Sequence, residues 1–190
     1  MDRSRCAWAA SAPEYLAYHD EEWGTPLHGD DALFERLCLE AFQSGLSWIT
    51  ILRKRPAFRA AFAGFAIDAV AAFTEDDEAR LLADAGIVRN RAKVAAAIRN
   101  ARVAREIPED LDALLWSFAP TAPRLRPATM ADVPSTSPES VAMARELKRR
   151  GFAFVGPTTA YALMQATGMV DDHVAGCFRA QDHERVRNAP

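Results

Sequence analysis

Apolar residues recur at helical spacing along nearly the whole chain. Leu33, Leu37 and Ala41, for example, form one stripe along residues 31–42. No segment shows sustained alternation of apolar and polar residues, which is the pattern of a half-buried strand. The pattern therefore predicts an all-α fold. The helices that we expect span residues 31–42, 47–55, 74–85, 90–105, 108–118, 138–151 and 158–167.

Capping residues and helix breakers set these bounds. Asn90 and Ser137 belong to the residue types whose side chains accept hydrogen bonds from the first turn of a helix. Pro56 is expected to end its helix, because proline lacks a backbone N–H. Residues 119–137 are rich in proline, serine and threonine, which predicts a long irregular connection. Few residues follow it, so we interpret the whole chain, 1–190, as one domain.

The composition is that of an ordinary globular protein, with 49% hydrophobic and 26% charged residues. No run of eighteen apolar residues occurs, so we expect no membrane span. The N-terminus lacks the continuous apolar core of a secretory signal. The odd count of 3 cysteines argues against a disulfide framework and predicts a reducing, cytoplasmic location.

The net charge of −3 does not by itself indicate a nucleic-acid-binding protein. Lysine and arginine residues nevertheless gather at residues 53–55, 89–93 and 148–150. Basic residues are favoured at helix C-termini, so each cluster taken alone is most simply a solvated helix end.

Two histidines and two cysteines near the chain ends supply the donors of a Cys₂His₂ metal site: Cys6, His19, His173 and Cys177. On a helix, His173 and Cys177 would share one face. Protein ligands at all the positions of tetrahedral Zn²⁺ leave no room for an activated water, so such a site would be structural. The spacing of Cys6 and His19 is not a standard zinc spacing, and spacing alone leaves the site open.

Glu40 falls within the apolar arc of the helix at 31–42. A buried carboxylate is costly unless it is paired. It is therefore either a structural glutamate bonded to an arginine or a helix end, or a carboxylate at the floor of a pocket. Nearby aromatic residues favour the pocket, since they could stack on a flat, electron-poor ring, although such residues are more often core. They are Trp8, Tyr15, Tyr18, Trp23 and Trp48.

Residues 151–156, GFAFVG, join two expected helices through a short apolar turn. The pattern resembles the helix-hairpin-helix motif, whose backbone N–H groups bind phosphate without reading sequence. Gly151, Val155 and Gly156 would form the turn, and Lys148 would add a counterion-releasing contact. On spacing alone, an ordinary connection between two helices remains the alternative.

Taken in order, these features resemble the bacterial 3-methyladenine DNA glycosylase I family of the helix-hairpin-helix glycosylase superfamily. The resemblance runs from residue 6 to about residue 177. It rests on YLAYHDEEWG at 15–24, LEAFQSGLSWI at 39–49, AGIVRNR at 85–91, KRRGFAFVG at 148–156 and DHVAGC at 172–177.

The resemblance implies an enzyme that flips 3-methyladenine out of alkylated double-stranded DNA and hydrolyses its N-glycosidic bond. It implies that Glu40 is the catalytic residue and accepts hydrogen bonds from the base, that Tyr18 and Trp48 stack on the base, and that Trp8, Tyr15 and Trp23 line the pocket. Gly45 and Leu46 match the family's wedge into the duplex. One structural zinc per chain would be bound by Cys6, His19, His173 and Cys177.

Asp171 stands where many members of the wider superfamily carry a catalytic aspartate. It could stabilise the developing sugar cation, or cap the helix that presents His173. We favour the cap, because the substrate's own charge reduces the need for assistance. Two rival functions are a non-enzymatic DNA-binding module and a zinc hydrolase. The first leaves Glu40 unexplained, and the second needs an open coordination position. We expect no obligate protein partner, and a disordered tail at 178–190.

Overall fold

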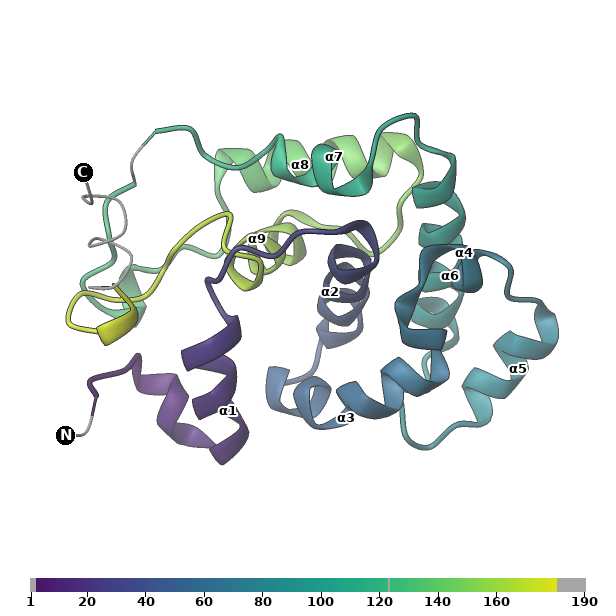
Figure 1. Cartoon of the computed structure of the whole chain (residues 1–190), viewed down its shortest axis with the longest axis horizontal. Coiled ribbons are helices and arrows are strands. Elements are labelled where there is room, and N and C mark those ends of the chain that lie inside the picture. The colour runs from purple at the N-terminus through teal and green to yellow at the C-terminus, as the bar shows by residue number, and fades with distance from the viewer. Residues whose placement is uncertain (1–2, 123, 181–190) are drawn as a thin grey trace.

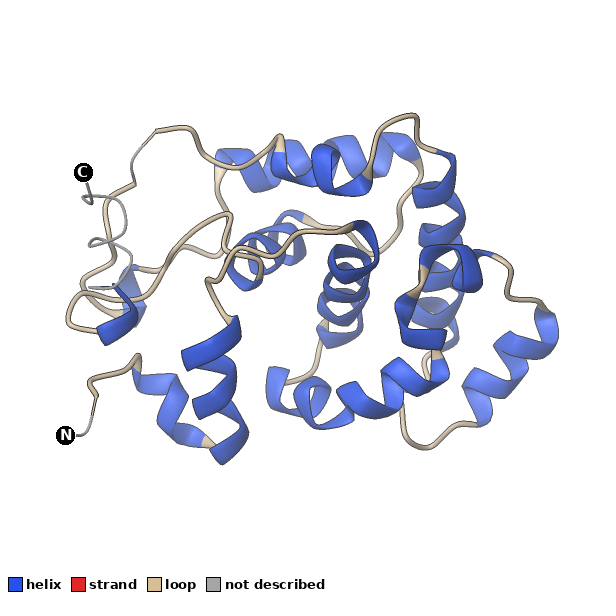
Figure 2. Cartoon of the chain, viewed as in Figure 1, coloured by secondary structure: helices blue, strands red, loops and turns tan. Residues whose placement is uncertain are grey.

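The structure, a computed structural model, describes residues 3–122 and 124–180. Every regular element within them is helical, so the expected all-α class is confirmed (Figure 2). The elements are η1 (Ala7–Ser11), α1 (Pro13–Ala17), η2 (Tyr18–Glu22), α2 (Asp30–Gln43), α3 (Trp48–Ala61), η3 (Ala63–Phe65), α4 (Ile67–Ala71), α5 (Glu75–Ala83), α6 (Arg91–Glu106), α7 (Leu111–Trp116), η4 (Met130–Asp132), α8 (Pro138–Arg150) and α9 (Pro157–Ala166).

Helix α2 runs through the middle of the molecule, with helices on several sides of it (Figure 1). Its apolar stripe is fully buried, and Leu33 and Leu37 have no exposed surface. Helices α3, α7 and α9 contact it, while α4 packs on α6 and α8 packs on α9. The burial of α2 on so many sides explains why polar residues on its inner face must find partners or line a cavity.

Two of the predicted helix starts are confirmed in atomic detail. The Asn90 side chain accepts a hydrogen bond from the backbone N–H of Lys93 at 3.1 Å. Ser137 and Ser140 form a reciprocal capping box at the start of α8. That helix ends as expected at Gly151, whose φ of 105° is a conformation that glycine adopts without strain.

The expected helix end at Pro56 is wrong, because α3 continues through this proline to Ala61. Proline removes a single helical hydrogen bond and disfavours the helix at the residue before it. Residues beyond it offset that cost by packing into the core, where Phe58 is fully buried and Ala61 is 5% exposed. Tertiary packing has therefore overridden a local helix-breaking signal.

The two ends of the described chain lie next to each other, as the purple and yellow segments of Figure 1 show. The backbone N–H of Phe178 donates to the carbonyl of Ser4 at 2.8 Å, and Ala180 is buried. The expected disorder of the tail is therefore wrong for residues 178–180, while 181–190 lie outside the described residues. None of the described helices is both long and apolar enough to cross a membrane.

Candidate functional site

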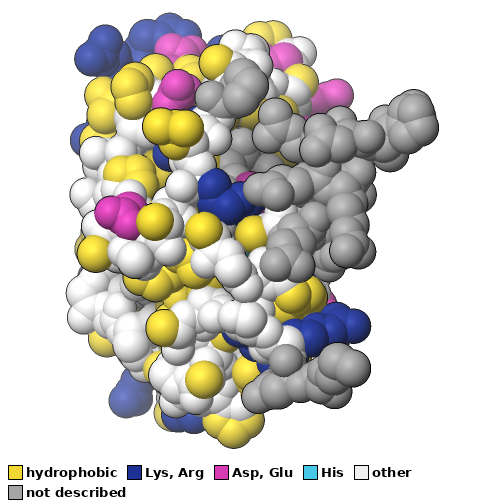
Figure 3. All heavy atoms as spheres, turned by 90° about the vertical axis from the view of Figure 1, so that its left-hand side faces the viewer, with side chains coloured by type: hydrophobic (Ala, Val, Ile, Leu, Met, Phe, Trp, Pro, Cys, Tyr) yellow, Lys and Arg dark blue, Asp and Glu magenta, His cyan; other side chains and the backbone are white. Residues whose placement is uncertain are grey.

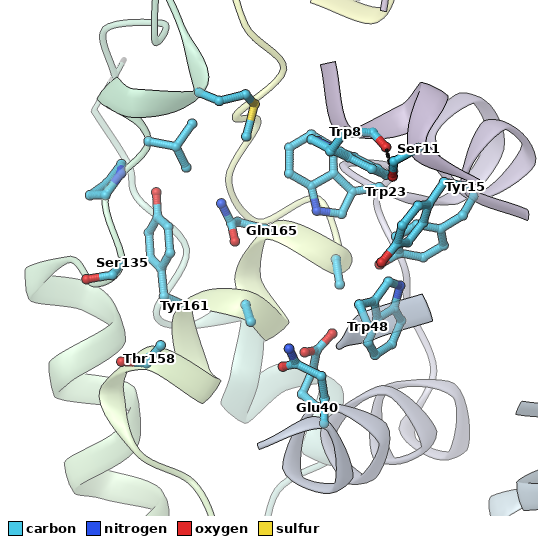
Figure 4. A pocket seen from close by; sticks show the side chains of 17 residues that line it. Trp8, Ser11, Tyr15, Trp23, Glu40, Trp48, Ser135, Thr158, Tyr161 and Gln165 are labelled. Carbon is cyan, nitrogen blue, oxygen red and sulfur yellow. Dashed lines mark hydrogen bonds between the residues drawn. The ribbon is translucent and has the colours of Figure 1, made fainter. Parts of the chain in front are cut away.

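A cavity of about 510 Å³ lies between the N-terminal helices, α2, α3 and α9. This volume is in the range of small-molecule sites. One wall consists of the aromatic residues singled out from the sequence together with Glu40 (Figure 4). The predicted substrate-binding residues, which are Trp8, Tyr15, Tyr18, Trp23, Glu40 and Trp48, therefore all line one cavity.

Glu40 points from α2 into the space between Trp48 and Gln165 (Figure 4). Its exposed fraction is only 5%. Burial raises the pKa of Glu40 to about 7, and the positive charge of Arg36 moderates the rise. No described residue donates a hydrogen bond to its carboxylate. A structural glutamate would instead be bonded to an arginine or a helix end. Glu40 thus presents acceptor oxygens to the cavity.

The aromatic wall is assembled by contacts among the rings themselves. Trp8 makes edge-to-face contacts with Tyr15 at 5.4 Å and with Trp23 at 5.2 Å between ring centroids. The ring centroids of Tyr18 and Trp48 lie 5.4 Å apart, and the two ring planes form an angle of 44°. Such pairs stabilise each other beyond their area of burial. The wall is therefore built before any ligand arrives.

The opposite wall was not predicted from the sequence. It comes from the irregular connection at 119–137, through Met130, Val133, Pro134 and Ser135, and from one face of α9. The part of this wall that α9 contributes could have been found from the sequence, because Thr158, Tyr161 and Gln165 recur at helical spacing and so share one face. Behind this wall lies Asp172, which accepts hydrogen bonds from the Tyr161 hydroxyl at 2.6 Å and from the Gln165 amide at 2.9 Å.

Close to the cavity, the expected metal-ligating residues gather at the joined chain ends. One ligand atom each from Cys6, His19 and Cys177 lies within 4.8 Å of the others, and all of these residues are buried. The buried His173 lies beside them, with its ring centroid 5.0 Å from that of His19. The segment from His173 to Cys177 is an irregular stretch with a turn, so the expected helix there is wrong.

Each of these histidines is held by a carboxylate through its Nδ1 atom. The distance is 2.8 Å from His19 to Asp20 and 2.8 Å from His173 to Asp171. This arrangement fixes the ring and directs Nε2 the opposite way, as in metal sites where a second residue orients the ligand. No helix starts at Asp171, so the helix-cap interpretation of this residue is wrong.

The expected DNA-contacting residues fall in two places. Gly45, with a φ of 81°, and Leu46, which is 40% exposed, lie in the turn between α2 and α3 beside the cavity. Gly151 and Gly156 bound the turn between α8 and α9. The side chain of Val155 is buried at 1%, so this residue could contact DNA only through its backbone.

The basic clusters are largely compensated within the protein. Lys148 is exposed, but its neighbours Arg149 and Arg150 form ion pairs with Glu146. On the face that Figure 3 shows, lysine and arginine side chains are scattered, with acidic side chains among them. The charge of this face therefore does not by itself mark a DNA-binding surface.

Comparisons with known proteins agree with this arrangement. The sequence model described as methyladenine glycosylase matches residues 8–180. DNA-3-methyladenine glycosylase 1 of Escherichia coli is 46% identical over 177 residues, or 91% of this chain and 95% of that protein. DNA-3-methyladenine glycosylase of Haemophilus influenzae is 39% identical over 178 residues, or 92% and 96% of the two chains.

Solved structures have the same architecture. A crystal structure of 3-methyladenine DNA glycosylase I is 45% identical, with a TM-score of 0.88, and the match covers 92% of this chain and 98% of that one. A structure of the Staphylococcus aureus enzyme, described for its recognition of 3-methyladenine, is 35% identical with a TM-score of 0.86 and coverage of 92% and 95%. The resemblance to the 3-methyladenine DNA glycosylase I family is confirmed, and the chain belongs to the methyladenine glycosylase family.

Proposed function

We propose that this chain, a DNA glycosylase by its family, excises 3-methyladenine from alkylated duplex DNA in the cavity around Glu40. The observation that carries the proposal is a buried carboxylate with no hydrogen-bond donor among the described residues, facing a wall of aromatic rings. The similar proteins support the choice of base, since they are named as 3-methyladenine DNA glycosylases. A base inside a duplex is out of reach, so the nucleotide must first be flipped out of the stack.

Recognition follows from the chemistry of the two partners. Methylation at N3 leaves the adenine in DNA with a positive charge. Tyr18 and Trp48 would stack on the ring and attract that charge through their π faces. The adenine amino group is a hydrogen-bond donor, and the Glu40 carboxylate would accept from it. An unmodified adenine carries no charge, so it gains less from both contacts.

The reaction requires little further assistance. Water attacks C1′ of the deoxyribose while the bond from C1′ to the base nitrogen breaks. The bonding electron pair leaves with the base, which departs neutral because it was cationic before. The water loses a proton to solvent, and the DNA retains an abasic site. The contacts to the departing base therefore serve to discriminate 3-methyladenine from other bases. They do not have to supply acid–base chemistry.

We also infer that Cys6, His19, His173 and Cys177 bind one structural Zn²⁺ per chain. The donor set fits this ion, since the ligand atoms of Cys6, His19 and Cys177 converge, the buried His173 lies beside them, and both imidazoles are oriented by aspartates. Ligands from both chain ends would tie them together, and binding energy would add to the energy of folding. With all ligands provided by protein, the ion would play no part in hydrolysis.

We infer further that α8, the turn at 151–156 and α9 form a helix-hairpin-helix unit that binds the DNA backbone. A Cβ added at Gly156 would meet nothing within 4 Å, so the backbone here is open to a ligand. Gly45 and Leu46, beside the cavity mouth, would fill the gap left by the flipped nucleotide. These contacts would position the duplex without reading its sequence.

Release of base from alkylated DNA tests the proposed activity directly. Duplex DNA treated with a methylating agent would be incubated with the protein, and the liberated bases separated by chromatography. We expect free 3-methyladenine with the wild-type protein and strongly reduced release with Glu40→Ala. DNA binding without any base release would favour the non-enzymatic DNA-binding module. Base release abolished reversibly by a chelator in a folded protein would favour the zinc hydrolase.

A further inference from the structure

A partly buried ion network joins Glu22, Arg36 and Arg55, none of which lines the cavity. Arg36 on α2 is 7% exposed, and its guanidinium lies 3.2 Å from the Glu22 carboxylate. Arg55 on α3 also pairs with Glu22, at 2.8 Å for one of its hydrogen bonds. Burial opposes the ionisation of Glu22, but the arginines outweigh it and hold its pKa below the usual value. Glu22 is therefore an anion at neutral pH, and arginine side chains in proteins do not lose their charge.

This network connects the elements that carry the cavity's central residues. Glu22 lies on η2 with Tyr18, Arg55 lies on α3 with Trp48, and Arg36 lies one helical turn before Glu40 on α2. The ion pairs thus join the aromatic rings to the helix that carries the acid.

Arg36 also faces the back of the aromatic pair. Its Cζ atom lies 5.6 Å from the centre of the Tyr18 ring and 5.9 Å from that of Trp48. The Nη1 atom of Arg36 is buried and makes no hydrogen bond within the described residues. A buried guanidinium with an unused donor is a costly arrangement for a residue with only a structural task.

We propose that Arg36 is a positioning residue whose charge, one helical turn from Glu40, favours the carboxylate form of that side chain, and whose ion pair with Glu22 holds the Tyr18 and Trp48 rings in place. The inference rests on the proposed role of Glu40 as an acceptor for the base. It assigns to Arg36 a share in substrate discrimination although Arg36 does not line the cavity.

Among the groups around Glu40, Arg36 supplies the charge that affects the ionisation of its carboxyl. Burial raises the pKa values of Tyr18 and of Tyr161 across the cavity, so both hydroxyls are neutral. Glu22 pairs with both Arg36 and Arg55, so their network keeps a net positive charge, and Gln165 carries no charge. Burial alone drives the Glu40 carboxyl toward its protonated form, and among the described residues Arg36 is the charge that opposes this. A protonated Glu40 would present a hydroxyl donor in place of one acceptor oxygen and would lose its attraction for a cationic base.

The test measures the ionisation of Glu40 without any ligand. Carbon-detected NMR would follow the side-chain carboxyl of Glu40 against pH in the wild type, in Arg36→Met and in Arg36→Lys. Methionine keeps the bulk and removes the charge, whereas lysine keeps the charge. We expect the Glu40 midpoint to rise by about one pH unit or more in Arg36→Met and to stay near the wild-type value in Arg36→Lys. An unchanged midpoint in Arg36→Met, or an equal rise in both variants, would overturn the inference.

A second variant guards against a failure to fold. Glu22→Gln removes the negative partner of Arg36 and makes the field at Glu40 more positive, so the Glu40 midpoint should fall. A rise or no change would contradict the proposal independently of the Arg36 variants.

Ligand binding then separates this inference from the proposed function. Affinity for free 3-methyladenine would be measured by tryptophan fluorescence at pH 6.5 and 8.5. For Arg36→Met we expect a loss of about three- to tenfold at the lower pH that disappears at the higher pH. An equal loss at both values would mean that Arg36 acts through packing alone. If Glu40→Gln binds the base as well as the wild type does, the proposed function fails, while the NMR titration still decides the role of Arg36.

Discussion

The carboxylate of Asp171 holds His173 at two points. It lies 2.8 Å from the ring Nδ1 and accepts a hydrogen bond from the backbone N–H of the same residue at 3.1 Å. Burial opposes the ionisation of Asp171, but the hydrogen bonds from His173 and Arg126 outweigh it and keep its pKa well below the usual value. Asp171 is therefore an anion that positions His173, and it does not line the cavity.

Asp171→Asn is expected to affect metal affinity more than catalysis. An amide keeps the size but weakens the orientation of His173, so zinc affinity should fall by about 10- to 100-fold. Single-turnover excision by the zinc-saturated variant should stay within about tenfold of the wild type. Asp20→Asn, which removes the matching partner of His19, serves as the control and should behave alike. A loss of several hundredfold in excision with Asp171→Asn alone would make this aspartate catalytic.

Cys6→Ala is expected to lower the thermal stability of the protein. The substitution removes one of the buried thiols at the joined chain ends, and ligand loss weakens the tie between them. Elemental analysis of the wild type should return about one zinc per chain, and the variant should contain clearly less. Cys38→Ala is the control, because Cys38 is buried elsewhere in the core. A wild type without zinc and a Cys6→Ala variant of unchanged melting temperature would contradict the structural site.

Gly156→Ala is expected to weaken the binding of damaged and undamaged duplexes equally. Its φ of −82° suits alanine and the added Cβ meets no atom within 4 Å, so the fold should tolerate the change. The methyl group would instead stand in the way of the DNA backbone. Fluorescence anisotropy with both duplexes, at matched salt, gives the affinities. A loss confined to the methylated duplex would place this turn in base recognition.

Glu40→Gln is expected to stabilise the fold at alkaline pH. The folded-state pKa of Glu40, about 7, lies above the value of 4.5 for an unfolded chain. The wild type therefore has its full stability below pH 4.5 and loses stability as pH rises through 7, whereas glutamine does not titrate. Relative to the wild type, the variant should gain on the order of 3 kcal/mol between pH 4 and pH 8.5. Urea unfolding at both values measures it, and a difference that is independent of pH would show Glu40 to be unperturbed.

The helices and the aromatic wall could be predicted from the sequence, because they depend on signals within short stretches of the chain or on residue types with strong preferences. Asn90 and Ser137 cap their helices with their own side chains, and the aromatic residues lie close together in the chain. The aromatic residues and Glu40 were predicted to share a pocket, and the structure places them around one cavity.

Other features depend on contacts between distant segments, which no single stretch of the sequence predicts. Pro56 stays helical because of buried residues further along α3. The wall formed by Ser135 and its neighbours belongs to a connection without periodicity, so nothing in its pattern pointed to the cavity. The Arg36–Glu22–Arg55 network joins three elements and is visible only once they are packed together.

Titration of free 3-methyladenine into the wild type and Glu40→Ala, followed by tryptophan fluorescence, tests the central claim most directly. Trp8, Trp23 and Trp48 line the same cavity as Glu40 and would report its occupancy. Loss of a charge-assisted hydrogen bond should cost about 1.5–3 kcal/mol, or roughly a 10- to 150-fold weaker affinity. Binding to Glu40→Ala with wild-type affinity, or no fluorescence change in the wild type, would contradict the assignment of this cavity as the base-binding site.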